Sequence, residues 1–377
     1  MMKVIFLVGL LLFVVGFVKK TFVRIVALSF ICLIFYNSVK HHWSQNCLRS
    51  KLSTYISCSR GSFSRRLLKF IKKEDVDVRV AHGQKIKLHV CSEYGNIKVS
   101  SWDKDFVRVS IVKRVAIKED LDLVNIDVET KDCVADSYAQ IVQVSDVGSF
   151  SKGIYRLFGW NVFGKRIMGR IDYTVMVPKF LSSINLETTA DVTMKGFRAN
   201  ELSVKSSRGN ITIADIVGDV TIYSEMSTID MFNVYGNVIS NVSRGNFQLV
   251  DIFGSVSLDA RTSPVYMKNV KGSIDLKMCR GDISLVNVDD RVTVNTITGK
   301  IDMDNVKGYV NVRSRRSDLS LKNIHKGANV YMSAGPIEIT RAYGGEGKIR
   351  AKTLDGQVTV RDSEGRVVSS SREVSIG

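Results

Sequence analysis

The hydrophobic pattern between residues 202 and 324 repeats every 18 residues without a gap. Each repeat opens with two positions that flank one other residue and that are apolar in every copy except at Ser240. A second such pair, apolar throughout, follows nine residues later. The first position of the repeat is apolar in every copy: Leu202, Val220, Val238, Val256, Ile274, Val292 and Val310. Alternation with a period of two is typical of a β-strand with one buried face. Two short strands per repeat predict an all-β fold, a β-solenoid (parallel β-helix) with 18-residue coils.

The two turns of each coil carry columns of their own. One corner holds only small residues, namely Gly209, Ser227, Gly245, Ser263, Gly281, Gly299 and Ser317. The other corner holds an acid or amide in every coil, namely Asp215, Asn233, Asp251, Asn269, Asn287, Asn305 and Asn323. Small residues permit close backbone approach or positive φ, and stacked amides can bond from coil to coil. Both columns are therefore explained by the shape of the coil.

An N-terminal membrane anchor, with one or two transmembrane segments, is predicted over residues 1–40. The apolar runs "VIFLVGLLLFVVGFV" (4–18) and "IVALSFICLIFY" (25–36) are separated by the basic stretch "KKTFVR". Each run is shorter than the roughly 20 residues that a straight spanning helix needs, so a tight hairpin and a single span both stay open. No small-x-small cleavage site follows the first run, which argues against a removable signal peptide.

A basic juxtamembrane linker is predicted over residues 41–74. Residues 1–73 hold 13 Lys or Arg and no acid, which leaves 41 basic against 37 acidic residues in the rest of the chain. The net charge of +17 therefore belongs to the N-terminal tract, where it favours a membrane surface over nucleic acid. The segment 62–73 is partly amphipathic as a helix, with one apolar face formed by Phe63, Leu67, Phe70 and Ile71.

The rest of the chain divides into a β-rich N-terminal part at residues 75–180 and solenoid repeats at residues 181–377. The first part alternates like the repeats but lacks their period, contains an insertion at 150–169, and is a candidate cap for one end of the rod. At the other end the chain stops in the strand-like "SREVSIG" (371–377). This predicts an open C-terminal coil, to which another β-strand could pair.

Catalytic and metal-binding patterns are absent from the repeats. The six cysteines contain no CxxC pair, although Cys47 and Cys58 could pair in an oxidising compartment. The corner column of Asp215 and its six equivalents, called the amide column below, lacks the paired glycines and carboxylates of calcium-binding β-rolls. The outward acids Asp230 and Asp302 are separated by several coils, too far apart for paired acid–base chemistry. We expect no cofactor and no enzymatic activity.

An arginine column is the first candidate binding site. Its members are 36 residues apart, one in every second coil: Arg208, Arg244, Arg280 and Arg316. A regular solenoid would place their guanidinium groups about 9–10 Å apart along one corner. They are either solvated turn residues or an anion-binding column for an envelope polymer that carries phosphate or carboxylate groups.

The insertion at 150–169 is the second candidate, as a loop that contacts a membrane or a partner protein. It interleaves basic residues with four aromatic ones, namely Tyr155, Phe158, Trp160 and Phe163. Exposed aromatic and basic residues suit a membrane interface. The other interpretation is an aromatic cluster that packs over the end of the solenoid as a cap.

The motifs of residues 75–377, taken in order, resemble the DUF4097 family of adhesin-like proteins, which is related to head-domain adhesin-like β-solenoids. The resemblance is carried by Gly95–Val99, by Trp102 and Asp103, by the strand that ends in Val177 and Pro178, and by Gly-x-Ile-x-Ile units such as Gly209–Ile213. It implies an extracytoplasmic or membrane-associated β-solenoid of the bacterial envelope, and it supplies no catalytic residues. The double hydrophobic start and the insertion depart from the family pattern.

Together these patterns favour a non-enzymatic, membrane-anchored β-solenoid of the cell envelope that acts in adhesion, scaffolding or surface sensing. The expected partners are membrane lipid and an anionic envelope polymer or another protein, and not nucleic acid. We expect the solenoid on the extracytoplasmic side, although the positive-inside rule leaves the cytoplasmic side open. The alternative is a homo-oligomeric rod, similar to bactofilins, that polymerises through its open C-terminal coil.

Overall fold

The structure is a computed structural model of the chain. It describes residues 68–80, 85–122, 124–132, 139–146, 154–157, 160–163, 169–341 and 347–376. The predicted anchor at 1–40, the linker up to residue 67 and the Cys47–Cys58 pair lie outside these residues. Within the part that the structure describes, no helix is both long and apolar enough to cross a membrane.

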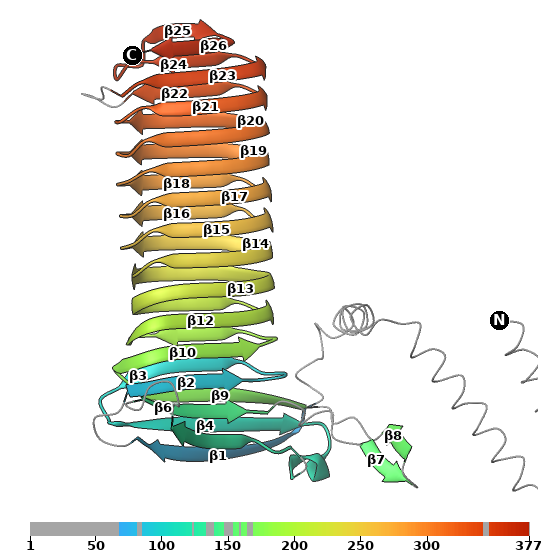
Figure 1. Ribbon diagram of the computed structural model, residues 1–377. Coiled ribbons are helices and arrows are strands. Elements are labelled where there is room, and N and C mark those ends of the chain that lie inside the picture. Colours follow the sequence, from blue (N-terminus) through green and yellow to red (C-terminus); the bar gives the residue numbers. More distant parts are fainter. Residues whose placement is uncertain are drawn as a thin grey trace, which may run out of the picture. The chain divides into compact units, whose positions relative to one another are not determined.

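The predicted β-solenoid is confirmed, with about ten coils stacked into one column (Figure 1). Val292 lies opposite Ile274 in the preceding coil and opposite Val310 in the next, which is the 18-residue register. The strands of the column are β10 (Phe180–Thr188), β11 (Val192–Lys195), β12 (Arg198–Arg208), β13 (Ile211–Tyr235), β14 (Val238–Ile252), β15 (Val256–Thr262), β16 (Val265–Val270), β17 (Ile274–Arg280), β18 (Ile283–Val288), β19 (Val292–Val306), β20 (Val310–Ile324), β21 (Ala328–Ala334), β22 (Ile337–Arg341), β23 (Ile349–Asp355) and β24 (Val358–Arg361).

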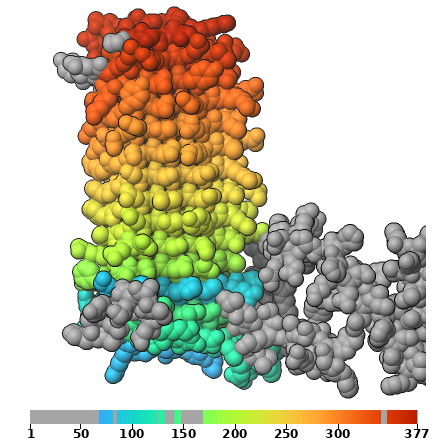
Figure 2. Space-filling view, viewed as in Figure 1, coloured from blue at the N-terminus to red at the C-terminus, as the bar shows by residue number. Residues whose placement is uncertain are grey.

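The core runs along the axis of the column, between the two strands of each coil. In β19, the inward residues Val292, Val294, Ile301 and Met303 are at most 1% exposed. Burial of such a side chain contributes about 1.5–3 kcal/mol, and every coil adds several of them to the same core. The side chains form level rows in the space-filling view, as expected when each coil contacts the next one (Figure 2).

The amide column turns one corner of every coil in the left-handed backbone region. All seven members have φ between 53° and 58°, and many of their side chains bond from coil to coil. The Nδ2 of Asn287 donates to Oδ1 of Asn269 at 2.9 Å, and the Nδ2 of Asn305 donates to Oδ1 of Asn287 at the same distance. Asparagine and aspartate are the residues, after glycine, that most readily adopt this conformation. The column thus fixes both the turn and the stacking.

The small-residue corner exists because consecutive coils approach closely there. A Cβ atom on Gly299 would lie 2.0 Å from the carbonyl oxygen of Gly281 in the coil below. The serines of this column are nearly inaccessible, with Ser263 at 0% exposure. Only residues of this size fit between the two stacked backbones.

Antiparallel strands close the N-terminal end of the column. Parallel stacking continues through β2 and β3 to β6 and β9, but β5 is antiparallel to β6, and β4 is antiparallel to both β9 and β1. The elements of this end are β1 (Phe70–Arg79), β2 (Lys85–Cys91), β3 (Ile97–Trp102), β4 (Phe106–Val115), the 3-10 helix η1 (Lys118–Leu121), β5 (Asp127–Asp132), β6 (Ala139–Ser145) and β9 (Gly169–Pro178).

The structure corrects part of the predicted amphipathic helix at 62–73. Phe70 and Ile71 belong to β1, which pairs with β4 from its first residue to its last. Their side chains are 36% and 55% exposed and lie on a strand, so they are not part of a helical face. Pairing with a distant strand outweighs the local pattern here. Phe63 and Leu67 lie outside the described residues.

The structure also corrects the predicted open C-terminal coil. After β24 the chain reverses, because the Asp362 carboxylate accepts hydrogen bonds from the backbone N–H groups of Glu364 and Arg366. The last two strands, β25 (Val367–Ser371) and β26 (Glu373–Ile376), therefore run antiparallel to β24 and β23. Val367, the first residue of β25, is 54% exposed. The chain therefore does not end in a further parallel coil, as the predicted repeats over 181–377 imply, and polymerisation through this end stays a prediction.

Candidate functional site

The strand registers place the four arginines in one column on every second coil. Met226 lies between Arg208 and Arg244, and Thr262 separates Arg244 from Arg280. Thr298 separates Arg280 from Arg316 in the same way. With coils about 4.8 Å apart, successive arginines lie about 10 Å apart along the small-residue corner.

Three members of the column are exposed cations. The side chains of Arg244, Arg280 and Arg316 are exposed, and Arg208 is half-buried. Within the residues that the structure describes, Arg244, Arg280 and Arg316 form no ion pair. Their guanidinium groups can therefore approach an anion without first giving up a protein carboxylate.

A shallow groove lies on the outer face of the second strands, on the other side of the same corner. It spans five coils and is lined by outward side chains that include Asp230, Gln248, Tyr266, Ser284 and Asp302. The Tyr266 side chain is 38% exposed and lies opposite Gln248 and Ser284 in the adjacent coils. The alternation of the second strands predicts that these positions face outward, but it does not reveal the groove. The one signal was an aromatic residue among polar ones.

The groove carries acidic and amide groups together with one lysine. The Lys300 ammonium lies 2.7 Å from Asp302, and this hydrogen bond raises the pKa of Lys300. The backbone N–H of Lys300 donates to the Asp282 carboxylate at 2.9 Å. Asp230, two coils from Tyr266, forms no ion pair with any described residue. Carboxylates and amides of this kind are acceptors for the hydroxyl groups of a ligand.

The insertion contributes a two-stranded antiparallel sheet of its own, formed by β7 (Ile154–Leu157) and β8 (Trp160–Phe163). Tyr155 lies in β7, and Trp160 and Phe163 lie in β8. Phe158 and the side chains of residues 151–168 are outside the described part. The membrane-contact and cap interpretations of this loop both stay predictions.

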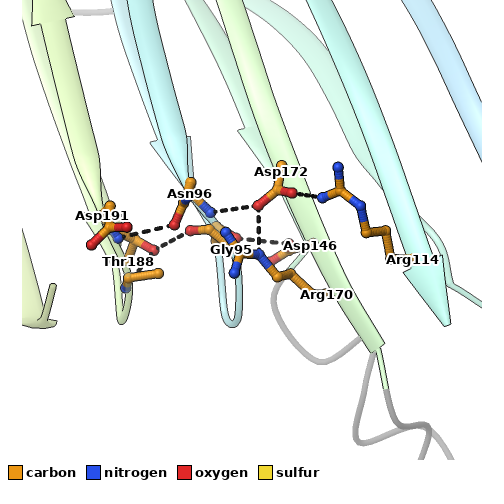
Figure 3. Close-up of polar contacts among 10 residues, drawn as sticks. Gly95, Asn96, Arg114, Asp146, Arg170, Asp172, Thr188 and Asp191 are labelled. Atoms are coloured by element: carbon orange, nitrogen blue, oxygen red, sulfur yellow. Dashed lines mark hydrogen bonds and ion pairs between the residues drawn. The ribbon is translucent and has the colours of Figure 1, made fainter. Parts of the chain in front are cut away.

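A polar network fixes the chain where it returns from the insertion (Figure 3). The Asp172 carboxylate accepts hydrogen bonds from Nε of Arg170 at 2.6 Å and from the backbone N–H of Asn96 at 3.0 Å, and it pairs with Arg114. The Asn96 side chain in turn accepts a bond from the backbone N–H of Asp191 at 3.1 Å. The start of β9 is thereby bound to β4 and to two turns of the solenoid.

Asp146 fixes the chain where it leaves for the insertion. Its carboxylate accepts hydrogen bonds from the Ser92 hydroxyl at 3.0 Å and from the backbone N–H of Glu93 at 2.6 Å. The residue is 1% exposed, and this burial raises its pKa. Burial also raises the pKa of the nearby Tyr173, with the Asp146 charge as the second cause. One turn, Ser92–Asn96, thus holds both ends of the insertion, a feature that the sequence did not predict.

Metal chemistry finds no support in the described ranges. They contain no group of three or more His, Cys, Asp or Glu residues that could hold an ion. The two described cysteines, Cys91 and Cys279, are free thiols.

One family model and several solved structures match the chain. A family model described as Toastrack DUF4097 matches residues 51–373. No curated protein matches the chain. Among solved structures, a "putative adhesin" from Bacteroides fragilis is 13% identical, with 78% of this chain and 97% of that chain covered and a TM-score of 0.25. A "putative adhesin" from Parabacteroides distasonis is 11% identical, with 77% and 97% covered and a TM-score of 0.27. A "putative lipid binding protein" from the same organism is 11% identical, with 78% and 95% covered and a TM-score of 0.24.

Proposed function

The chain belongs to the Toastrack DUF4097 family, and we propose that it is a non-enzymatic β-solenoid of the cell envelope that binds an anionic polymer. The observation that carries this proposal is the column of Arg208, Arg244, Arg280 and Arg316. Its members are held at a constant spacing by the strand registers, and three of them are exposed without an ion pair in the described part of the chain. The role is adhesion or scaffolding.

The spacing of the column favours a polymer over a small anion. A guanidinium group binds phosphate or carboxylate through two parallel N–H donors, but a single exposed contact is weak because water and salt compete for both partners. Four contacts to one polymer chain bind more tightly than four separate contacts. Once the first contact forms, the others become intramolecular, and the total affinity exceeds that of any single site. A rigid β column keeps the four groups in register.

Two features of the groove support a binding role over catalysis. Its acids lie on an open face of the rod, and Asp302 is neutralised by Lys300 at 2.7 Å. A glycosidase or lyase needs a pair of carboxylates, or a carboxylate and a base, converging on one bond in a site that excludes water. An exposed acid already paired with a lysine does not suit that task.

We further propose that residues 1–40 anchor the protein in a membrane and that the basic residues of 41–74 contact an anionic leaflet. The support is the apolar sequence of the first segment and the absence of acids before Glu74. The full chain should sediment with membranes and resist extraction by alkaline carbonate, whereas a chain that begins at residue 41 should not. The location is tested with a reporter enzyme that is active only outside the cytoplasm, fused after Gly377. Activity supports the envelope location, and an expressed but inactive reporter would overturn it.

The arginine column is tested by replacing its four members with alanine and measuring the binding of inorganic polyphosphate and of hyaluronate. The matched control removes four other exposed arginines, Arg291, Arg313, Arg350 and Arg372, and so causes the same change in net charge. We expect the column variant to lose at least tenfold in affinity for both polymers and the control to lose much less. Equal losses of affinity in the two variants would mean that the column contributes only to the net positive charge, and they would refute the proposal.

A further inference from the structure

We propose that the groove centred on Tyr266 holds the sugar rings of the polymer, so that the ligand is an acidic polysaccharide with one charge per disaccharide. This inference rests on the proposed function, because it takes the arginine column as the site of the charges. It adds a second site on the neighbouring face and names the chemical class of the ligand.

The groove and the column lie on either side of one corner. Asn246, which lines the groove, follows Arg244 by two residues, and Asp282 follows Arg280 in the same way. The residue between each pair is a glycine of the small-residue corner. A chain that lies along this corner can therefore place charged substituents on the arginines while its backbone contacts the groove.

Tyr266 has the properties of a platform for a sugar ring. Its side chain is 38% exposed, and its neighbours in the stack, Gln248 and Ser284, are not aromatic. The side chain before it on the same outer face is Pro264, which also lines the groove. The C–H face of a pyranose packs on an aromatic ring, while its hydroxyl groups need acceptors beside that ring.

Those acceptors are present on both sides of the platform. Asp230 and Asp302 lie two coils away from Tyr266 in opposite directions along the same outward row. Carboxylate and amide oxygens accept hydrogen bonds from hydroxyl groups, and the Gln248 and Asn246 amides can also donate. The groove thus combines one apolar platform with polar partners, as carbohydrate sites require, and it differs from the purely cationic column.

The two sites share one period. Asp230, Tyr266 and Asp302 are 36 residues apart, as are the members of the arginine column. Two coils rise about 10 Å along the axis. An extended pyranose residue is about as long as one coil is high, so the two-coil period corresponds to a disaccharide. A polysaccharide with one carboxylate per disaccharide would meet an arginine at each of its charges.

The distance between Asp230 and Asp302 excludes paired acid–base catalysis by these two residues. Asp230 and Asp302 are four coils apart, which is about 19 Å along the axis. The two carboxyl groups of glycoside hydrolases are about 5–10 Å apart. The pair cannot act on one glycosidic bond.

The test compares a polymer that has sugar rings with one that has none. Hyaluronate carries one carboxylate per disaccharide, whereas inorganic polyphosphate carries charge without rings. The full chain, in detergent, is prepared as Tyr266→Ala, as Tyr266→Phe, which keeps the ring, and as the control Tyr331→Ala. Tyr331 is also exposed, at 45%, but it lies on the face formed by the first strands.

We expect Tyr266→Ala to weaken hyaluronate binding about tenfold, as loss of a central aromatic contact does, and to leave polyphosphate binding unchanged. Tyr266→Phe and Tyr331→Ala should bind both polymers like the wild type. If Tyr266→Ala binds hyaluronate normally, or weakens both polymers equally, the inference is overturned. The proposed function has a separate criterion, because the four-arginine variant must weaken both polymers whatever Tyr266 does.

Discussion

Replacing Asn287 by alanine removes one link from the amide column in the middle of the solenoid. The wild-type side chain donates to Asn269 and accepts from Asn305, each at 2.9 Å, while its backbone has a φ of 56°. The substitution therefore has two separable effects. It deletes two hydrogen bonds between coils, and it places a residue with a Cβ atom but no compensating side chain in the left-handed region.

The size of the effect follows from these two contributions. Each hydrogen bond contributes about 1 kcal/mol net, so the loss of both costs about 2 kcal/mol. Alanine in the left-handed region adds about 1 kcal/mol. We expect the free energy of unfolding to fall by about 3 kcal/mol in Asn287→Ala. Asn287→Gly loses the same bonds without the backbone cost, so it should fall by about 2 kcal/mol.

Urea denaturation followed by far-UV circular dichroism measures both variants against the wild type. The control is Asn241→Ala, which removes an exposed amide from the outer face of a strand and should change stability by less than about 0.5 kcal/mol. The account of the column is refuted if Asn287→Ala resembles this control. It is also refuted if the glycine variant is less stable than the alanine variant, because the left-handed backbone would then carry no cost.

Two further predictions concern the turn that holds the insertion. In Gly95→Ala the new Cβ atom would lie 1.5 Å from the Ile171 carbonyl oxygen, so we expect a loss of more than about 3 kcal/mol, and an unchanged melting temperature would contradict it. Asp146 has a native pKa above its ordinary value of 3.8, so the native state binds this proton more tightly than the unfolded state does. Its contribution to stability is complete below pH 3.8 and is lost as the pH rises through the native pKa. Asp146→Asn should lack this loss, and urea midpoints from pH 4 to pH 7 that fall equally in both proteins would disprove the assignment.

The solenoid could be predicted from the sequence because its geometry is local and repeated. Val292 and Ile301 report a strand period, and their recurrence 18 residues away reports the stacking. Alternation does not encode strand direction, however. Val374 and Ile376 alternate as in any strand, and the turn at Asp362 is what reverses the chain before them.

The missed features depend on contacts between distant segments. Phe70 and Ile71 fit a helical face as a local pattern, yet their partner strand ends at Val115. The bond between Asp172 and Asn96 spans 76 residues, with no motif that links the two positions. The groove around Tyr266 is lined by side chains from five coils, and the repeat period alone does not show a hollow there. The arginine column was predictable because it obeys the repeat itself.

The central claim, that four arginines on alternate coils bind one polyanion, is tested most directly by the salt dependence of polyphosphate binding. Each neutralised charge on a single-stranded polyanion adds about 0.7 to the slope of log affinity against log salt. Replacing Arg208, Arg244, Arg280 and Arg316 together should therefore reduce that slope by about 3. The control variant at Arg291, Arg313, Arg350 and Arg372 should keep the wild-type slope. A column variant with the wild-type slope would contradict the account.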